Sequence, residues 1–539
     1  MDWITWSALV ALIGLIYYFF AKKYEYFDSK PIPLVRPTFL LGSTAPILFR
    51  RRNVLTHVNE IYYTYPDAKM IGFFDLVNPI YMLRDPETIK QIAIKDFDFF
   101  SDHTPMLSPS EVDEDTETLF GNSLFALRGQ KWRDMRATLS PAFTGRKMRH
   151  MFELVGECGK SMASFFRAEL EKGEDLELEM KDVFSRYGND VIASVAFGIS
   201  VDSLRDKENE FYVKGKDMLK FNMLKMLWKV IIMRSMPSLA RKLKLDFTDA
   251  VFIKYFKGTI EDNMKQRKTH NIVRNDMIQM LMDVQRGALS HQQEEKDGKD
   301  AGFATVEESA VGKATHSRTW SNNELIAQCF LFFLAGFETT SGGLSFLLYE
   351  LCVNPEIQQR LHEEILQTSD SLNGQPLTYE TLQKMEYMDM VVSESLRKWP
   401  PMPFTDRYCH RDYLFEGVAE KPFIMEKQST AWIPIIAIHR DAKYYPDPDK
   451  FDPERFSKEN RSRILAGAYL PFGVGPRNCI GSRLALMEVK SAVYHLVKEF
   501  EFVPSSKTEI PLELSRKNTF GLQTQNGVWL KMKSRNVIG

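Results

Sequence analysis

The chain has 539 residues, of which 44% are hydrophobic and 12% aromatic, so it is long and apolar enough to bury a large core. Its 70 basic and 71 acidic residues leave a formal net charge of −1, which excludes a global field suited to nucleic acid or to an anionic surface. Five cysteines, few and widely spaced, fit a reducing compartment better than a disulfide framework. They are Cys158, Cys329, Cys352, Cys409 and Cys479.

The N-terminal segment Ile4–Ala21 carries no charge and would be about 27 Å long as a helix, close to the thickness of a bilayer's hydrocarbon core. A cleaved signal peptide is the alternative, but Asp2 stands where a basic start is expected and no small-x-small cleavage site follows. Lys22 and Lys23 come next, which favours a body on the cytosolic side. Prolines at 31, 33 and 37 predict a stiff connection. We expect a transmembrane signal-anchor at residues 1–21, a basic, proline-containing hinge at 22–43 and one folded body at 44–539.

Short elements are predicted after the hinge. Apolar segments at Met70–Phe74 and Ile80–Leu83 are separated by turn residues and indicate β-strands before a helix that begins near Asp85. Met151–Gly198 predicts two or three amphipathic helices. The body is therefore expected to be mainly helical, with a small β-sheet lobe.

Two pairs of residues stand at helical spacing, and neither is informative alone. Trp132 and Arg136 lie four apart in a helix that opens at residue 129, where a packed tryptophan beside a surface arginine is the ordinary interpretation. Glu394 and Arg397 lie three apart in a helix predicted at 387–399, and exposed pairs of this kind contribute little. Arg455 follows in F-D-P-E-R-F.

A long helix is predicted from Ser321, where S-N-N-E has the form of a capping box, to about Val353. Glu338 is the one charged residue between Leu325 and Tyr349, so a second transmembrane helix is an alternative. Polar and small residues in the middle of this stretch favour a buried core helix. The stretch contains A-G-F-E-T-T at residues 335–340.

Three other stretches are open to more than one interpretation. Residues 218–245 are apolar with interleaved lysine and arginine, and suit either a core helix or a surface that dips into a membrane. Residues 286–318 lack an apolar period and indicate a surface loop. Asn526-Gly527 predicts a terminal hairpin between apolar runs.

The most informative stretch is P-F-G-V-G-P-R-N-C-I-G at residues 471–481. Glycine and proline predict a tight turn that presents Cys479 just before an apolar, helically patterned run. The free N–H groups at the start of a helix favour a thiolate, which is a metal ligand. Arg477 stands two residues away and could donate to an anionic group of a metal-carrying ligand. A lone cysteine is most often a small buried side chain, but here it belongs to the pattern F-x-x-G-x-R-x-C-x-G.

This pattern resembles the haem-binding loop of the cytochrome P-450 superfamily, and the match is complete. The other motifs resemble the same family in the same order, from the anchor to the C-terminus. A-G-F-E-T-T is similar to the family's oxygen-activating helix, and the W-x-x-x-R and E-x-x-R pairs also match. The loop and the D-H-T-P-M-L-S-P stretch at 102–109 look most like animal microsomal clan 3, and within it the insect family nine, which is associated with the oxidation of foreign compounds.

The resemblance implies a role for each matching residue. Cys479 would be the axial ligand of haem iron, and Thr339 with Glu338 would deliver protons to bound oxygen. Glu394, Arg397 and Arg455 would form a buried structural network. Residues implied to bind the cofactor are Trp132, Arg136, Ala335, Arg407, Phe472, Arg477, Cys479 and Gly481. The stretch 519–522 would contribute late to the substrate pocket.

The implied enzyme is a monooxygenase with haem b (iron protoporphyrin IX) as cofactor and O₂ as co-substrate. It would insert one oxygen atom into apolar small molecules, such as plant toxins or insecticides. Electrons would come from NADPH through a separate cytochrome P-450 reductase, with cytochrome b5 as a second candidate donor. Lys131, Arg133 and Arg483 are candidate docking residues, with ordinary surface charge as the alternative. No nucleic-acid partner is expected, and the body would lie on the cytosolic face of the endoplasmic reticulum membrane as a single-pass protein.

Three other functions compete with this one. A biosynthetic hydroxylase of an endogenous lipid or hormone has the same motifs. A haem–thiolate isomerase would need no reductase, and the Glu338-Thr339 pair argues against it. A haem-binding sensor or carrier would not need the complete oxygen-activation motif.

Overall fold

The computed structural model describes residues 3–105, 118–173, 175–218, 228–229, 232, 237–243, 245, 249–285, 302–313, 318–517 and 521–535. Part of the D-H-T-P-M-L-S-P stretch, most of the apolar stretch 218–245, much of the loop 286–318 and residues 519–520 lie outside this described part.

The described residues form helices joined by short strands, as follows. The α-helices of the first half are α1 Trp3–Tyr24, α2 Ala45–Leu48, α3 Val54–Tyr63, α4 Pro86–Lys90, α5 Gly129–Leu139, α6 Gly145–Leu170, α7 Met180–Phe197, α8 Glu210–Met218, α10 Pro237–Lys242, α11 Ala250–His270 and α12 Met277–Gln285. Those of the second half are α13 Asn322–Val353, α14 Pro355–Ser371, α15 Tyr379–Gln383, α16 Glu386–Lys398, α17 Ile435–His439 and α18 Ser482–Glu499. The strands are β1 Met70–Asp75, β2 Asn78–Leu83, β3 Leu176–Glu179, β4 Thr405–Tyr408, β5 Tyr413–Phe415, β6 Phe423–Met425, β7 Thr430–Ile433, β8 Phe500–Pro504 and β9 Trp529–Ser534.

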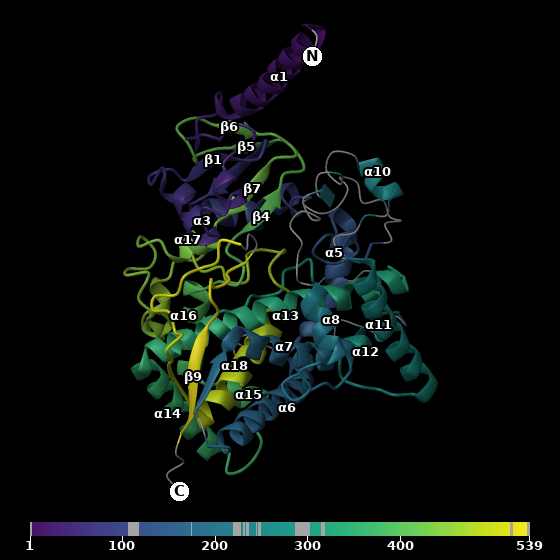
Figure 1. Ribbon diagram of the computed structural model, residues 1–539, viewed down its shortest axis with the longest axis vertical. Coiled ribbons are helices and arrows are strands. Elements are labelled where there is room, and N and C mark those ends of the chain that lie inside the picture. The colour runs from purple at the N-terminus through teal and green to yellow at the C-terminus, as the bar shows by residue number, and fades with distance from the viewer. Residues whose placement is uncertain are drawn as a thin grey trace.

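The molecule has two lobes (Figure 1). The lobe nearer the N-terminus holds a four-stranded sheet in the order β1-β2-β7-β4, and the β5–β6 hairpin lies beside it. The larger lobe is helical and includes the small sheet β3-β9-β8. Each lobe has its own cluster of buried apolar side chains, so the fold is mainly helical with a small β-sheet lobe, as expected.

The long helix α13 is the central element of the helical lobe (Figure 1). Ser321 accepts a hydrogen bond from the Glu324 backbone N–H, and the Glu324 carboxylate accepts one from the Ser321 N–H, so the predicted capping box is present. The helix packs against α7, α16 and α18. It is apolar enough to span a membrane by composition, but more than half of its most apolar window is buried inside the protein. Its hydrophobicity therefore serves the core.

The N-terminal helix α1 differs from α13 because none of its residues is buried. It is long and apolar enough to cross a membrane. The connection that follows it packs closely onto the sheet lobe, with Phe27 and Ile32 buried. Lys30 also forms an ion pair with Glu426 beside strand β6. The helix thus projects from the folded body, and its apolar side chains are not buried against it (Figure 1).

Most predicted elements match the observed ones closely. Strands β1 and β2 and the start of α4 lie where the turn residues indicated, with Asp85 capping α4 through the Thr88 N–H. The terminal hairpin prediction is wrong in its pairing. Asn526-Gly527 leads into β9, but β9 pairs with β8 and β3 rather than with the run just before the turn. Long-range pairing with β8 outweighs the local turn signal.

Candidate active site

One stripe of α13 is not buried. Between Leu325 and Cys352, the residues that are not buried recur every three or four positions, which places them on one side of the helix. They include Leu331, Ala335 and Thr339, and Ala335 is exposed although the helix lies inside the lobe. The small Ala335 therefore borders an open internal space, whereas Gly336 allows Ile192 to pack closely against the helix.

The loop that carries Cys479 is held by its own backbone. The Cys479 N–H donates to the Phe472 carbonyl at 2.8 Å, and the Asn478 N–H donates to the Gly475 carbonyl at 2.9 Å. Gly475 has a φ of 74°, and a Cβ there would stand 1.9 Å from the Ala93 carbonyl oxygen. Only glycine fits this turn.

The cysteine loop reaches the buried side of α13 through Phe143. Its ring lies 5.6 Å from that of Phe332 on α13, and a Cβ on Gly481 would stand 4.0 Å from it. Arg483 donates to the Phe143 carbonyl at 3.3 Å. Helix α18 begins at Ser482, directly after the loop, and packs along α13.

Cys479 is the one exposed cysteine of the five, all of which lie in the described part of the chain. Protein nevertheless surrounds it, and burial raises the pKa of the Cys479 thiol. The Gly481 backbone N–H and the charge of Arg136 lower the pKa of Cys479 in the opposite direction. Cys479 thus opens into an internal space. Burial raises the pKa of its thiol by more than the adjacent helix start, which the sequence suggested would dominate, lowers it.

Glu338 and Thr339 lie on the open stripe. The Thr339 hydroxyl donates to the Ala335 carbonyl at 2.6 Å. Glu338 Oε1 lies 3.0 Å from Lys181 Nζ on α7 and accepts a hydrogen bond from Gln523 at 3.0 Å. Desolvation lowers the pKa of Lys181. The acid is therefore held between a lysine and the amide of Gln523, which follows the stretch 519–522 in the sequence.

Arg407 and Trp132 both offer buried donors at this site. Arg407 is fully buried and donates to the carbonyls of Asp406 and Val474, at 2.6 and 2.8 Å. Among the described residues, nothing accepts from its Nε–H, and desolvation lowers the pKa of Arg407 to about 10. Trp132 is buried, and its ring stacks 3.9 Å from the Arg477 guanidinium carbon.

Arg477 and Arg136 donate more hydrogen bonds within the protein than Arg407 does. Arg477 donates to Asp102 at 2.8 Å and to three backbone carbonyls between 101 and 127, and its burial lowers the pKa of Arg477 to about 9. Arg136 donates to Asn478 and to both carboxylate oxygens of Glu308. These contacts tie the cysteine loop to distant segments of the chain.

The structure brings Glu394, Arg397 and Arg455 together at the end of α16. Arg397 donates from Nε and Nη2 to the two oxygens of Glu394, at 2.6 and 2.8 Å, and both side chains are fully buried. Arg455 Nε lies 3.5 Å from Glu394 Oε1. The Asp452 N–H donates to the same oxygen, and Arg397 also donates to the His439 carbonyl. The network therefore pins α16 to the segment 439–455.

The residues fit a haem bound by its iron and by its carboxylates. Cys479 is exposed although protein surrounds it, and a soft thiolate is a suitable iron ligand. The unpaired Nε–H of the buried Arg407 is a donor for a carboxylate. The donor set and the internal space thus agree with the group that the sequence resemblance implies.

A family comparison agrees with this site. Residues 33–530 match the model of the family Cytochrome P450, and the chain belongs to this family. It is a monooxygenase of the oxidoreductase class. Family membership implies haem, O₂, a redox partner and a small-molecule substrate.

The similar proteins are insect enzymes over nearly their whole length. The chain is 41% identical to Cytochrome P450 9e2 of Blattella germanica, over 98% of both chains. It is 39% identical to Cytochrome P450 9c1 of Drosophila melanogaster, over 99% of both. It is 35% identical to Cytochrome P450 6k1 of Blattella germanica, over 97% of this chain and 96% of that protein. The resemblance to insect family nine is thus confirmed.

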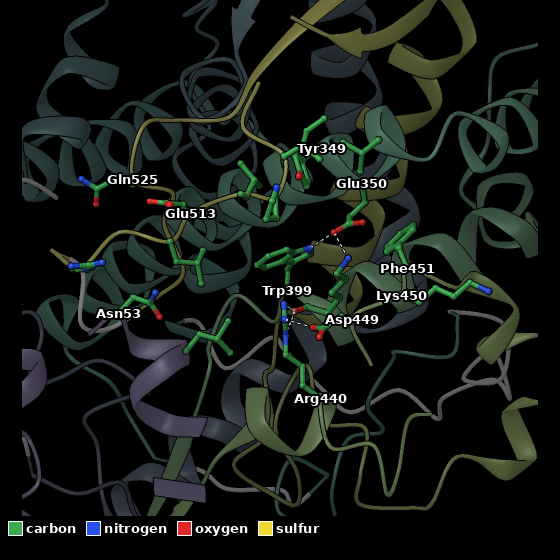
Figure 2. Close-up of a pocket in the computed structure, with 18 of the residues that line it drawn as sticks. Asn53, Tyr349, Glu350, Trp399, Arg440, Asp449, Lys450, Phe451, Glu513 and Gln525 are labelled. Carbon is green, nitrogen blue, oxygen red and sulfur yellow. Dashed lines mark hydrogen bonds and ion pairs between the residues drawn. The ribbon is translucent and has the colours of Figure 1, made fainter. Parts of the chain in front are cut away.

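A cleft of about 930 Å³ lies elsewhere, at the C-terminal end of α13 (Figure 2). The buried Glu350 accepts from the Trp399 indole N–H at 2.7 Å and pairs with Lys398 at 2.9 Å. Arg440 pairs with Asp449 at 3.1 Å. Neither Cys479 nor the open stripe of α13 lines this cleft, so it is separate from the candidate active site.

Sequence reasoning missed several partners. Lys181, Asp102 and Glu308 contact predicted site residues from 157 to 375 positions away, and no local pattern marks them. Glu308 even lies in a stretch that indicated a surface loop. The sequence offers one weak indication that Lys181 has a partner. It lies near the start of an apolar helix, and lysine side chains are seldom buried in proteins.

Proposed function

We propose that this chain is a membrane-anchored monooxygenase that holds haem b through Cys479 and oxidises apolar small molecules. The exposure of Cys479, directly after the buried Arg477 and Asn478, is the observation that carries the proposal. When bound, a thiolate-ligated haem activates O₂, so that one oxygen atom enters the substrate and the other leaves as water.

The chain's own residues supply the remaining functions. Arg407 and Trp132 would bind haem carboxylates, Arg407 through the Nε–H that no described residue accepts, and Arg477 stacks on the Trp132 ring. Arg136 would hold the loop next to the ligand and offer its one remaining N–H. Phe472 and Gly481 would set the position of the sulfur through their backbone groups.

Thr339 and Glu338 would deliver protons. The Thr339 hydroxyl lies on the open stripe and could turn from the Ala335 carbonyl to donate its proton at the site. The Glu338 carboxylate is partly exposed and lies 3.0 Å from Lys181 Nζ, so it could pass protons between solvent and the open stripe.

The substrate would be apolar because small and apolar side chains line the open stripe of α13. Foreign compounds such as plant toxins or insecticides suit this surface, and the likeness to insect family nine supports that choice. Electrons would come from NADPH through a separate reductase. Helix α1 would place the body on the cytosolic face of the endoplasmic reticulum membrane.

The test is the carbon monoxide difference spectrum of the dithionite-reduced protein. The wild type should show the red-shifted band of a thiolate-ligated haem, and Cys479→Ser should lose that band. Cys409→Ser is the matched control, since Cys409 is buried in the sheet lobe. A red-shifted band in the Cys479 variant would contradict the assignment of the iron ligand.

A further inference from the structure

The cleft at the C-terminal end of α13 takes its lining from both lobes of the molecule. Tyr349 and Phe451 belong to the buried apolar cluster of the helical lobe, whereas Trp399 and Leu514 belong to that of the sheet lobe. These four buried side chains form what we call the floor of the cleft. The volume of about 930 Å³ lies within the range of small-molecule binding sites.

The floor is apolar and held in place by its own contacts. The Trp399 ring stacks on that of Phe346, with the ring centroids 4.7 Å apart, and the indole N–H donates to Glu350 at 2.7 Å. On Trp399 also lies the Arg440 guanidinium, whose central carbon is 4.7 Å from the ring centroid. A ligand would therefore meet a preformed apolar surface.

The charged groups next to the floor neutralise one another. Glu350 pairs with Lys398 at 2.9 Å, and Arg440 pairs with Asp449 at 3.1 Å (Figure 2). The carbonyl end of α13 is also covered, because the Asn354 backbone N–H and side-chain amide both donate to the Glu350 carbonyl, at 3.1 and 2.8 Å. These groups leave no unpaired charge at the floor.

The rim of the cleft, in contrast, carries unpaired positive charge. We define the rim as the exposed lining residues Arg50, Lys450, Glu513, Arg516 and Lys517. No carboxylate in the described part of the chain pairs with Arg50, Arg516 or Lys517, and Lys450 reaches Asp452 only at 4.0 Å. Glu513 is the single acid of the rim. An excess of cations above an apolar floor suits a ligand that has an apolar body and an anionic group.

Two segments near the C-terminus pair with each other beside the cleft. The Ser515 N–H donates to the Gln523 carbonyl at 2.7 Å, and the Gln525 N–H donates to the Glu513 carbonyl at 2.8 Å. Glu513 and Gln525 line the cleft, and both lie on the same side of Trp399 in Figure 2. The paired segments thus form one wall of the cleft.

The same pair of segments reaches the candidate active site. Gln523, two residues before Gln525, donates from its side-chain amide to Glu338 Oε1 at 3.0 Å. Backbone hydrogen bonds join the two segments, so a ligand that rests against Gln525 restrains Gln523 as well. Occupancy of the cleft is therefore transmitted to the residue that holds Glu338.

We propose that this cleft is a second binding site, which takes an organic anion with an apolar body, and that the bound anion steadies the paired segments that hold Glu338. The apolar body lies on the floor, and the anionic group pairs with the rim cations. The inference goes beyond the proposed function, because no lining residue of the cleft belongs to the candidate active site and binding needs no electron donor.

The test uses the full-length, haem-containing protein and two fluorescent probes with the same aromatic body. The probe 8-anilinonaphthalene-1-sulfonate carries an anionic group, and N-phenyl-1-naphthylamine lacks it. Both are titrated into the wild type, Arg50→Glu, Arg516→Glu and the control Arg463→Glu. Arg463 is exposed like the other two arginines but does not line the cleft. Saturating 1-phenylimidazole, an azole that ligates haem iron, fills the active site throughout, and the absorbance spectrum confirms that each variant is folded.

We expect Arg50→Glu and Arg516→Glu each to raise the Kd of the sulfonate about fivefold, because each reverses a charge that faces the anion. The Kd of the neutral amine should change less than about twofold, and Arg463→Glu should bind both probes as the wild type does. The bound sulfonate should also slow hydrogen exchange of the Ser515 and Gln525 amides about threefold in the wild type.

Three results would overturn the proposal. They are an unchanged Kd of the sulfonate in both cleft variants, an equal loss of affinity in Arg463→Glu, or unchanged exchange of the Ser515 and Gln525 amides when the sulfonate is bound. A wild type without a thiolate band would instead refute the proposed function. The probe titrations would still decide the cleft in that case, because its floor and rim do not involve Cys479.

Discussion

At the scale of single residues, the chain buries ionisable groups that its sequence does not distinguish from surface ones. Glu488 on α18 is 1% exposed and accepts one hydrogen bond, from the Thr340 hydroxyl on α13 at 3.3 Å. Among the described residues its other oxygen, Oε1, has no partner. Tyr187 and Cys158 are the titratable groups beside it. Burial raises the pKa of Glu488 to about 8, so the folded protein keeps this carboxyl neutral at pH 7.

This buried acid makes stability depend on pH. Because the pKa of Glu488 is about 8 in the folded chain and near 4.5 in the unfolded one, the unfolded chain releases a proton between these values that the folded chain retains. Stability therefore falls as the pH rises from about 4.5 to about 8. In Glu488→Gln this side chain cannot ionise. Between pH 5 and 8, the free energy of unfolding of the variant should therefore fall by about 2–4 kcal/mol less than that of the wild type.

Urea unfolding at the two pH values, followed by fluorescence, measures this difference. Glu501→Gln is the control, because Glu501 is exposed on the neighbouring strand β8. The same pH dependence in the wild type and in Glu488→Gln would show that Glu488 is already ionised in the folded protein.

At the scale of elements, buried charge holds helix α16 in place. The Glu394 carboxylate pairs with Arg397 and Arg455 and also accepts a hydrogen bond from the Asp452 backbone N–H. Removing its charge leaves two arginines without their anion inside the protein, which is a strongly unfavourable state. Glu394→Gln should therefore destabilise the protein by about 3–5 kcal/mol.

Thermal unfolding of this variant should be compared with that of Glu386→Gln. Glu386 lies on the same helix, is exposed, and pairs with the exposed Lys458, so its loss should cost less than about 1 kcal/mol. If both variants unfolded at the same temperature, the buried network would not be what anchors α16.

At the scale of the whole molecule, we expect helix α1 and the folded body to be separable. No residue of α1 is buried, whereas Phe27 and Ile32 just beyond it belong to the core of the sheet lobe. Deleting residues 2–21 should therefore leave the haem spectrum unchanged and weaken association with membranes, as measured by sedimentation with microsomal lipid vesicles. A longer deletion to residue 35 should lower stability, because it removes core side chains. A truncated protein that stayed fully membrane-bound would show that α1 is not the attachment.

Local patterns in the sequence determined much of this protein. Capping residues, turn residues and apolar periodicity predicted the ends of α13, the strands β1 and β2 and the uncovered helix α1, because each depends on neighbours within a few positions. The cysteine loop was recognisable for the same reason, since its turn and its thiol lie in one stretch of eleven residues. The resemblance of the motifs then indicated the family.

Tertiary structure alone decided which side chains meet. Glu338 with Lys181, Arg477 with Asp102 and Arg136 with Glu308 are pairs separated by more than a hundred residues, and charge at one position says nothing about its partner at the other. The same holds for β9, which takes its partner from a distant strand rather than from its nearest turn. Burial likewise sets whether Glu488 is neutral and whether Cys479 opens to internal space. These properties depend on desolvation and on through-space distance, which the order of residues does not contain.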